Sequence, residues 1–282
     1  MKFRVLLLAI ICSSSLFSQN IQSPKEFLGY ELGKQFTRHH RVVDYFTYVS
    51  TQLDNVLLEK YGETNERRPL YVSYISSKKN IENIEQIRHN NLGQTGLKPA
   101  SINDIAIVWL SYNVHGNEAS STEASMQTLY ELVTTKKDQL ENTLVIIDPC
   151  INPDGRDRYA NWYNQVKSEP YNTDQNAKEH REPWPGGRAN HYLFDLNRDW
   201  AKYNQPEIKQ VTTHIVKEAK EGENEIVLGL DFHSTHYDVY YTFDDAVERK
   251  LPGFTKEWLS QIEKELELVD INEQPSGLNQ PI

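Results

Sequence analysis

Three apolar runs constrain this chain more than any other feature, because each leads directly into a polar loop. The runs are IAIVWLSY (105–112), TLVIIDPC (143–150) and EIVLGLDFH (225–233). Continuous apolar stretches of this length are typical of strands covered on both faces of a sheet. Helical segments are expected between them, at about 120–137 and 205–220. The alternation predicts an α/β fold with a mixed, largely parallel central sheet and helices on both faces.

The region before these runs carries one helical signal and one strand signal. Apolar residues recur at helical spacing from Phe36 to Tyr61, where Gly62 ends the pattern. We therefore expect a single helix there, within a helical lead-in at about residues 24–62. Pro69 then introduces the alternating, β-branched stretch LYVSYIS, which predicts a strand.

The N-terminus has the layout of a secretory signal peptide. Two basic residues in MKFRVLLLAIICSSSLFSQN precede an apolar run that is too short to span a bilayer. We expect a signal peptide at 1–18, a catalytic-type domain at 19–282, and a secreted or periplasmic protein. A lipoprotein anchored through Cys12 is the weaker alternative. Only Cys150 would remain after cleavage, so no internal disulfide is expected.

The charge and composition exclude some partners. A net charge of −10 argues against nucleic acid and against an anionic membrane surface, since both call for a basic patch. A hydrophobic share of 38% with 25% charged residues is ordinary for a globular protein. No segment after the N-terminus is apolar enough to predict a membrane span.

The loops that follow the apolar runs contain the residue types of a metal site. They are HGNE, NPDGR and DFHS, at 115–118, 152–156 and 231–234. Ligand sites of α/β sheets lie beyond the carboxyl ends of the strands. Hydrolytic zinc sites use three protein ligands from His and carboxylate. His115, Glu118 and His233 are the candidate ligands, and the alternative for each His alone is an ordinary hydrogen-bonded side chain.

Four ordered pieces of the chain resemble the zinc carboxypeptidase family, the funnelins that include carboxypeptidases A, B and D. They are HGNE, NPDG, GRANHYLFDLNRDW (187–200) and DFHS, and they span about residues 105–240. The resemblance implies one Zn²⁺ ion held by His115, Glu118 and His233. It also implies a zinc metallocarboxypeptidase, a hydrolase that acts on the C-termini of peptides or proteins.

The resemblance also assigns roles to residues near the ligands. Asp195 matches the position that holds the second nitrogen of His115, although a turn-capping Asp is the alternative. Arg198, with Asn197 beside it, matches the pair that anchors the substrate's terminal carboxylate. Arg188 matches the arginine that polarises the scissile carbonyl while a water on zinc attacks it.

The chain departs from the family pattern in the same segment. Asp199 replaces the second Asn of the commoner NRN form, so its carboxylate is expected either to pair with an arginine or to repel the substrate's terminus. Arg156 and Arg158 are rivals to Arg188 for the oxyanion role, and we expect them instead to form salt bridges within their loop.

The resemblance further implies a general-base Glu some seventy residues after His233, which falls beyond Ile282. The glutamates that remain lie on KEWLSQIEKELELV, where the pattern predicts the solvated face of a helix. They are Glu257, Glu263, Glu265 and Glu267. We therefore expect the chain to be a partial product that binds zinc but turns peptides over poorly.

Other functions remain open from the sequence. A zinc amidase or deacylase would cut small N-acyl amino acids or cell-wall peptides. A non-catalytic zinc or peptide-binding module would recognise peptide C-termini without cleavage. The remaining alternative is an α/β domain in which the polar cluster has no function.

Overall fold

The computed structural model describes residues 20–94, 105–170, 172–220 and 228–233. The expected signal peptide with Cys12 and the glutamates after residue 256 lie outside these residues, so their assignments stay predictions. Among the described residues, no helix combines the length and the apolar character that a membrane crossing requires.

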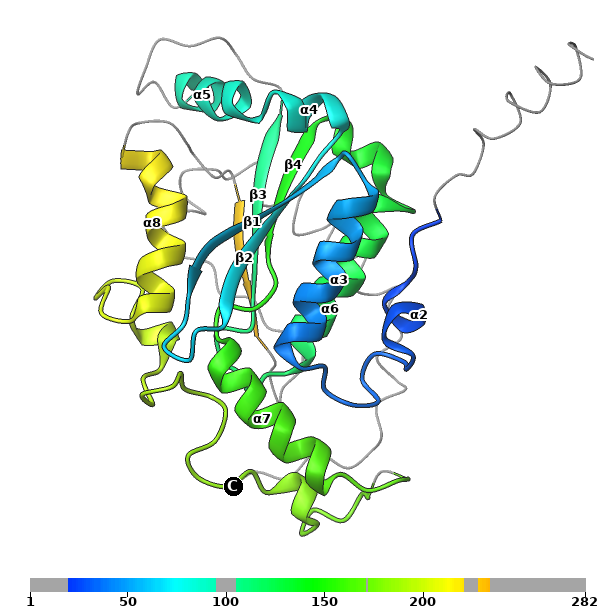
Figure 1. Cartoon of the computed structure of the whole chain (residues 1–282). Helices are drawn as coiled ribbons and strands as arrows, with labels where there is room; N and C mark the ends of the chain where they lie inside the picture. Colours follow the sequence, from blue (N-terminus) through cyan, green and yellow to red (C-terminus); the bar gives the residue numbers. More distant parts are fainter. Residues whose placement is uncertain (1–19, 95–104, 171, 221–227, 234–282) are drawn as a thin grey trace, which may run out of the picture. The chain divides into compact units, whose positions relative to one another are not determined.

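Five strands among the described residues form a mixed sheet at the centre of the fold (Figure 1). Its strands are β1 (Val56–Glu63), β2 (Pro69–Ile75), β3 (Ala106–Tyr112), β4 (Thr143–Asp148) and β5 (Leu228–Phe232). They lie in the order β1-β2-β4-β3-β5. Strand β3 is parallel to β4 and to β5, whereas β2 is antiparallel to β1 and β4. The predicted α/β fold with a mixed sheet is confirmed.

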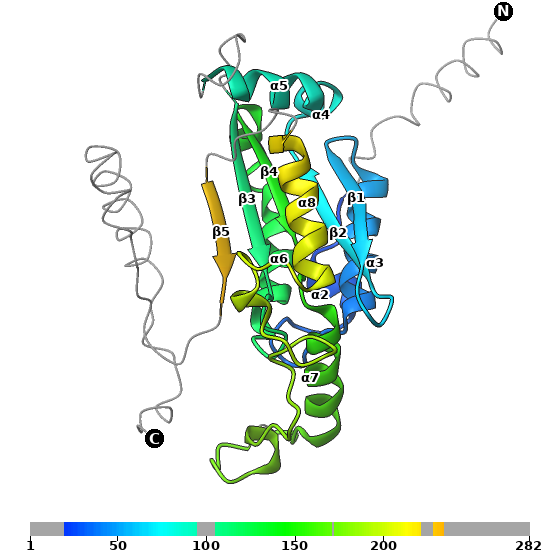
Figure 2. The same cartoon turned by 90° about the vertical axis from the view of Figure 1, so that its left-hand side faces the viewer.

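Helices cover both faces of this sheet. They are α2 (Pro24–Leu28), α3 (His39–Gln52), α4 (Lys78–Glu82), α5 (Ile84–Gln94), α6 (Ser120–Val133), α7 (Pro153–Val166) and α8 (Pro206–Lys220). The described part of the chain also contains short 3-10 helices, η1 (Lys137–Glu141), η2 (Lys178–His180) and η3 (Leu196–Arg198). In Figure 2, α8 lies in front of the sheet, and α3 and α6 lie behind it.

The two faces have separate apolar cores. On the α3 and α6 side, Phe46 and Met126 pack with Ile147 of β4 in one buried cluster. On the other face, Tyr74 of β2 packs with buried apolar residues of β3, β4 and α5. The Tyr74 hydroxyl lies 2.7 Å from Nε2 of His214 on α8. Burial on both faces explains the continuous apolar runs of the central strands.

The prediction of one helix from Phe36 to Tyr61 was wrong beyond Gln52. Helix α3 ends there, and strand β1 begins at Val56 and pairs with β2. Leu53 is already extended, with φ −127° and ψ 132°. The apolar residues after Leu53 fit a half-buried edge strand as well as a helix, and tertiary pairing decides between the two.

The parallel strands end at one edge of the sheet, where the polar loops begin. Tyr112 of β3 is in register with Phe232 of β5, and Ser111 with Asp148 of β4. The rings of Tyr112 and Phe232 stack with centroids 4.4 Å apart. The HGNE loop therefore leaves the sheet beside His233, which directly follows β5.

Candidate metal centre

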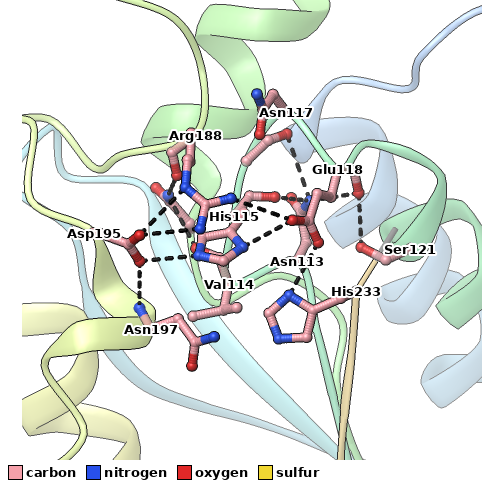
Figure 3. Close-up of polar contacts among 12 residues, drawn as sticks. Asn113, Val114, His115, Asn117, Glu118, Ser121, Arg188, Asp195, Asn197 and His233 are labelled. Atoms are coloured by element: carbon pink, nitrogen blue, oxygen red, sulfur yellow. Dashed lines mark hydrogen bonds and ion pairs between the residues drawn. The ribbon is translucent and has the colours of Figure 1, made fainter. Parts of the chain in front are cut away.

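His115, Glu118 and His233 come together at this edge of the sheet (Figure 3). Nδ1 of His115 lies 2.8 Å from one carboxylate oxygen of Glu118, and Nδ1 of His233 lies 3.0 Å from the other. The two imidazole rings have centroids 5.0 Å apart. Two histidines that are 118 positions apart in the sequence thus face one carboxylate.

The geometry of these three side chains fits a zinc ion. Their ligand atoms all lie within 4.8 Å of one another. Two ligands at about 2.1 Å from a tetrahedral zinc are about 3.4 Å apart, so the observed pairs need to open by only a few tenths of an ångström. The donor set of two imidazole nitrogens and one carboxylate is the set that zinc hydrolases use.

The cluster attracts positive charge. Nε2 of His233 lies 3.1 Å from a carboxylate oxygen of Asp231, opposite its contact with Glu118. The hydrogen bonds to Asp231 and Glu118 raise the pKa of His233 to about 10, against the opposing effect of burial. Carboxylates on both sides of the ring therefore stabilise a cation at this position.

Asn113 shapes the loop that carries two of the ligands. It is fully buried and has φ of 60°, a left-handed conformation that Asn tolerates better than most residues. Its side-chain amide donates to the carbonyls of His115 (2.8 Å), Gly116 (3.5 Å) and Glu118 (3.0 Å). One side chain thus fixes the backbone between both ligands.

The loop continues directly into helix α6. The sequence predicts this helix at about 120–137, where Ser120 and Ser121 are the residue types that favour an N-cap. The N-cap is instead Ala119, without a side-chain cap, and the helix ends at Val133. The carbonyl of Glu118 accepts the Ser121 hydroxyl at 2.9 Å, so this serine supports the ligand loop from inside the helix.

Asp195 holds the far side of the first ligand. One carboxylate oxygen accepts Nε2 of His115 at 2.9 Å and the backbone N–H of Asn197 at 2.9 Å. Burial opposes ionisation, but hydrogen bonding from His115 and the charge of Arg188 lower the pKa of Asp195 below its usual value. Asp195 is also the N-cap of η3. The sequence left contact with His115 and capping of a turn as alternatives for Asp195. The structure shows both contacts.

Arg188 lies against the same cluster, as Figure 3 shows. Its Nη2 and Nε atoms are 3.1 and 3.2 Å from the second oxygen of Asp195. Its Nη1 atom is 3.5 Å from a carboxylate oxygen of Glu118. The guanidinium is half-exposed, so it can contact both the ligand set and a molecule in solution.

Asn197 and Arg198 lie on η3, which follows Asp195. The Asn197 side-chain oxygen accepts the indole N–H of Trp200 at 3.0 Å. Arg198 is exposed, and its Nη1 donates to the carbonyl of Asn197 at 3.2 Å. The structure places this arginine on the turn next to the histidine-orienting aspartate, with its guanidinium in solvent.

The departure at Asp199 has a structural role. Asp199 is buried, and its carboxylate accepts the backbone N–H groups of Asn204 and Gln205 at 2.9 and 2.7 Å, just before α8. The expectation that this carboxylate pairs with an arginine or repels the substrate's terminus does not fit these contacts, because its oxygens are turned to the backbone.

Arg156 and Arg158, the other candidates for the oxyanion role, donate mainly to backbone carbonyl groups. Arg156 is fully buried, and its Nε donates to the carbonyl of Thr37 at 2.9 Å. Arg158 donates to the carbonyls of Gly186 (2.8 Å) and Asn190 (3.0 Å), on either side of Arg188. We expected salt bridges within the loop, and both side chains are used mainly to hold carbonyl groups of other segments.

Three glycines allow the loops of the site to approach one another. A Cβ atom on Gly116 would collide with the backbone of Gly155 and Gly187. A Cβ atom on Gly155 would lie 2.5 Å from the carbonyl oxygen of Ala189. Gly116, Gly155 and Gly187 are therefore required by close packing of three backbones, a reason that the sequence alone did not reveal.

A second group of candidate ligands is already engaged with an arginine. Glu66, Asp154 and His191 also offer atoms within 4.8 Å of one another. Nη1 of Arg68, however, lies 2.5 Å from Glu66 and 2.7 Å from Asp154. One guanidinium thus pairs with both carboxylates, so this cluster is an ion-pair network.

The chain is similar to several carboxypeptidases of known structure. No curated protein matches the chain. Carboxypeptidase A from Helicoverpa armigera superposes with a TM-score of 0.50 and 18% identity over 83% of this chain and 52% of that one. A metallo-carboxypeptidase from Pseudomonas aeruginosa in complex with (2-guanidinoethylmercapto)succinic acid gives a TM-score of 0.43 and 17% identity over 71% and 40%. A metallo-carboxypeptidase from Burkholderia cenocepacia gives a TM-score of 0.42 and 17% identity over 70% of this chain and 41% of that one.

The first of these structures shows the fold, and this chain spans only about half of its length. The sequence model of the family described as "Zinc carboxypeptidase" matches residues 43–272, which include every candidate site residue named above. The chain therefore belongs to the zinc carboxypeptidase family.

Proposed function

We propose that the protein is a zinc-dependent metallocarboxypeptidase that acts on the C-termini of peptides. One Zn²⁺ ion would be held by His115, Glu118 and His233. The observation that carries this proposal is the convergence of these three side chains within 4.8 Å, with the guanidinium of Arg188 against the same carboxylates. Family membership supports the same reaction class.

A zinc ion bound there would supply a Lewis acid and an activated water for attack on an amide carbonyl. The protein's own groups would do the rest. Arg188 is placed to donate to the carbonyl oxygen as negative charge develops on it, an electrostatic effect that is typically worth about 3 kcal/mol. Asp195 keeps the Nδ1 atom of His115 directed at the metal position by holding Nε2.

Recognition of the C-terminus would fall to Arg198 and Asn197. A planar guanidinium pairs with both oxygens of a carboxylate, which favours a free peptide terminus over an amide. The exposed guanidinium of Arg198 is available for such a ligand. The buried position of Asp199 supports this role, because its oxygens accept backbone N–H groups and do not face the arginine.

Metal content and substrate preference together test the proposal. Purified protein should bind one zinc ion per chain, measured by inductively coupled plasma mass spectrometry. Blocked dipeptides with a free carboxylate should bind the zinc-loaded protein more tightly than the matching amides. Arg198→Ala should remove that preference, whereas Lys202→Ala, which deletes a nearby exposed cation, should keep it. An unchanged preference in Arg198→Ala would remove the carboxylate-anchor assignment.

One further expectation rests on the sequence alone. We propose that the protein is exported, on the basis of the basic and apolar N-terminus, and N-terminal sequencing of the mature product would test cleavage near residue 18.

A further inference from the structure

Most of the exposed large apolar side chains among the described residues lie in the segment that contains Arg188 and Asp195. Apart from Leu57 on β1, those among the described residues lie between positions 184 and 203. They are Trp184, Tyr192, Leu193, Phe194 and Tyr203. Single exposed apolar residues need no explanation, but a concentration of them in one segment marks an interaction site.

Three of these residues form a turn between two residues of the site. Tyr192, Leu193 and Phe194, which we call the apolar turn, are 64%, 44% and 53% exposed. The chain reaches them from Arg188 and leaves them at Asp195, and these two residues contact each other at 3.1 Å. At no more than 3.8 Å between consecutive Cα atoms, the backbone of the apolar turn lies within about 11 Å of Asp195.

The apolar turn is held rigidly in an unfavourable conformation. Leu193 has φ of 64°, a left-handed conformation that is unfavourable for a residue with a Cβ atom. Asn190 is fully buried, and it accepts the N–H of Phe194 at 3.0 Å and the N–H of Leu193 at 3.2 Å. Its side-chain amide donates to Gln205 at 2.9 Å. The buried side chain of Asn190 thus holds the backbone of the apolar turn in a conformation that leaves its side chains exposed to solvent.

A second tether holds the apolar turn from the opposite side. Nδ1 of His191 lies 2.9 Å from a carboxylate oxygen of Glu66, which follows β1. The ring of His191 packs edge-on against Tyr192 with centroids 4.5 Å apart. Backbone strain and preorganised exposed groups of this kind are retained where they serve binding.

We propose that the apolar turn binds apolar side chains of the peptide substrate on the N-terminal side of the bond that is cut. The proposal rests on the proposed carboxypeptidase function. A carboxypeptidase removes the last residue, so the rest of the substrate must leave the site toward solvent. Exposed side chains on the rim of the site therefore meet the residues that precede the scissile bond. A peptide residue spans about 3.3 Å, which places the apolar turn within reach of the first three or four of them.

Binding of cleavage-resistant peptides tests this inference. Two fluorescent pentapeptides share an Ala-Ala end whose linking amide is reduced, and carry either Leu-Phe-Leu or Gly-Ser-Gly before it. Each is made with a free and with an amidated C-terminus, and binding to the zinc-loaded protein is measured by fluorescence anisotropy. The protein should bind the apolar peptide about tenfold more tightly than the polar one. The double variant Tyr192→Ser/Phe194→Ser should reduce this ratio to below about twofold.

The controls separate the possible failures. Leu57→Ser removes an exposed apolar residue of β1 and should leave the tenfold ratio unchanged. Equal binding of free and amidated peptides would contradict the proposed function. Two outcomes would overturn the role of the apolar turn while leaving the proposed function intact. In the first, the protein prefers free termini but binds the apolar and polar peptides equally. In the second, it prefers the apolar peptide and the double variant keeps that preference. Loss of a dimer in the double variant, seen by sedimentation without a change in peptide preference, would assign the turn to self-association and would likewise overturn it.

Discussion

Replacing Asn113 tests whether zinc affinity depends on the shape of the loop that carries His115 and Glu118, because the metal-binding atoms themselves stay unchanged. This side chain touches no metal ligand atom, yet its amide donates to the backbone carbonyls of His115 and Glu118. Asn113→Gly deletes the amide and tolerates the left-handed backbone at φ 60°. Asn113→Ala deletes the same amide and adds backbone strain. A comparison of the two variants separates the effect of the lost hydrogen bonds from the effect of backbone strain.

The expected magnitude follows from the partners that remain. After the deletion, the carbonyl of His115 still accepts the N–H of Glu118 at 3.1 Å, and the carbonyl of Glu118 still accepts the Ser121 hydroxyl at 2.9 Å. Neither carbonyl is left without a partner, so each lost bond should cost about 1 kcal/mol. With the small cavity added, Asn113→Gly should lower the free energy of unfolding by about 2–3 kcal/mol, and Asn113→Ala by about 1 kcal/mol more.

Zinc affinity is the decisive measurement. Residues that orient metal ligands typically change affinity by about 10–100-fold, and we expect a loss in that range for both variants. Affinity would be measured by competition with a chelator, and stability by urea denaturation of the metal-free protein. Asn80 offers a matched control, because its buried amide also donates to three acceptors, in Ser76, Leu140 and Glu141.

Asn80→Ala should cost similar stability and leave zinc affinity unchanged. The reasoning fails if Asn113→Gly folds, loses stability as expected, and still binds zinc within about threefold of the native protein. In that case the two ligands would find their geometry without the Asn113 amide, and the loop would be positioned by the surrounding backbones alone.

The remaining predictions concern packing and pH. Gly116→Ala should fold poorly or lose zinc binding, measured by circular dichroism and chelator competition, because its Cβ atom collides with the backbone of Gly155. Burial lowers the pKa of His39 to about 4, so unfolding should become easier by about 3 kcal/mol as pH falls from about 6.5 to 4, and His39→Gln should flatten this slope in urea titrations. Burial raises the pKa of Asp148 to about 7, so stability should fall as pH rises from about 4 to 7, and a slope that persists in Asp148→Asn would contradict this.

The part of the fold that could be predicted is the part in which sequence pattern and tertiary environment agree. Strand β4 is buried along almost its whole length, and most of β3 is buried or half-buried, so their apolar runs agree with their environment. The ends of parallel strands meet at one edge, which is why the loops bearing His115 and His233 could be placed together before any coordinates were known. The ordered motifs then supplied the roles that pattern alone leaves open.

Features that depend on contacts between distant segments could not be predicted. Strand β1 is an edge strand whose apolar residues also fit a helix, and only pairing with β2 decides its conformation. Asn113 looks like an ordinary loop residue until its three carbonyl partners are visible. The need for Gly116 arises from backbones about 40 and 70 positions away in the chain, and no local signal reports such distances.

The charges around the site favour a cation in this cluster. Three carboxylates, from Glu118, Asp195 and Asp231, surround it, and Arg188 supplies one permanent positive charge. The carboxylates on both sides of His233 also favour its protonated form. One Zn²⁺ ion would bring two positive charges to the same carboxylates. The ion would also draw the Glu118 carboxylate away from Arg188, which now lies 3.5 Å from it, and would leave the guanidinium to a substrate carbonyl. We therefore expect the contact between Arg188 and Glu118 to weaken, and the contact with Asp195 to persist, when zinc binds.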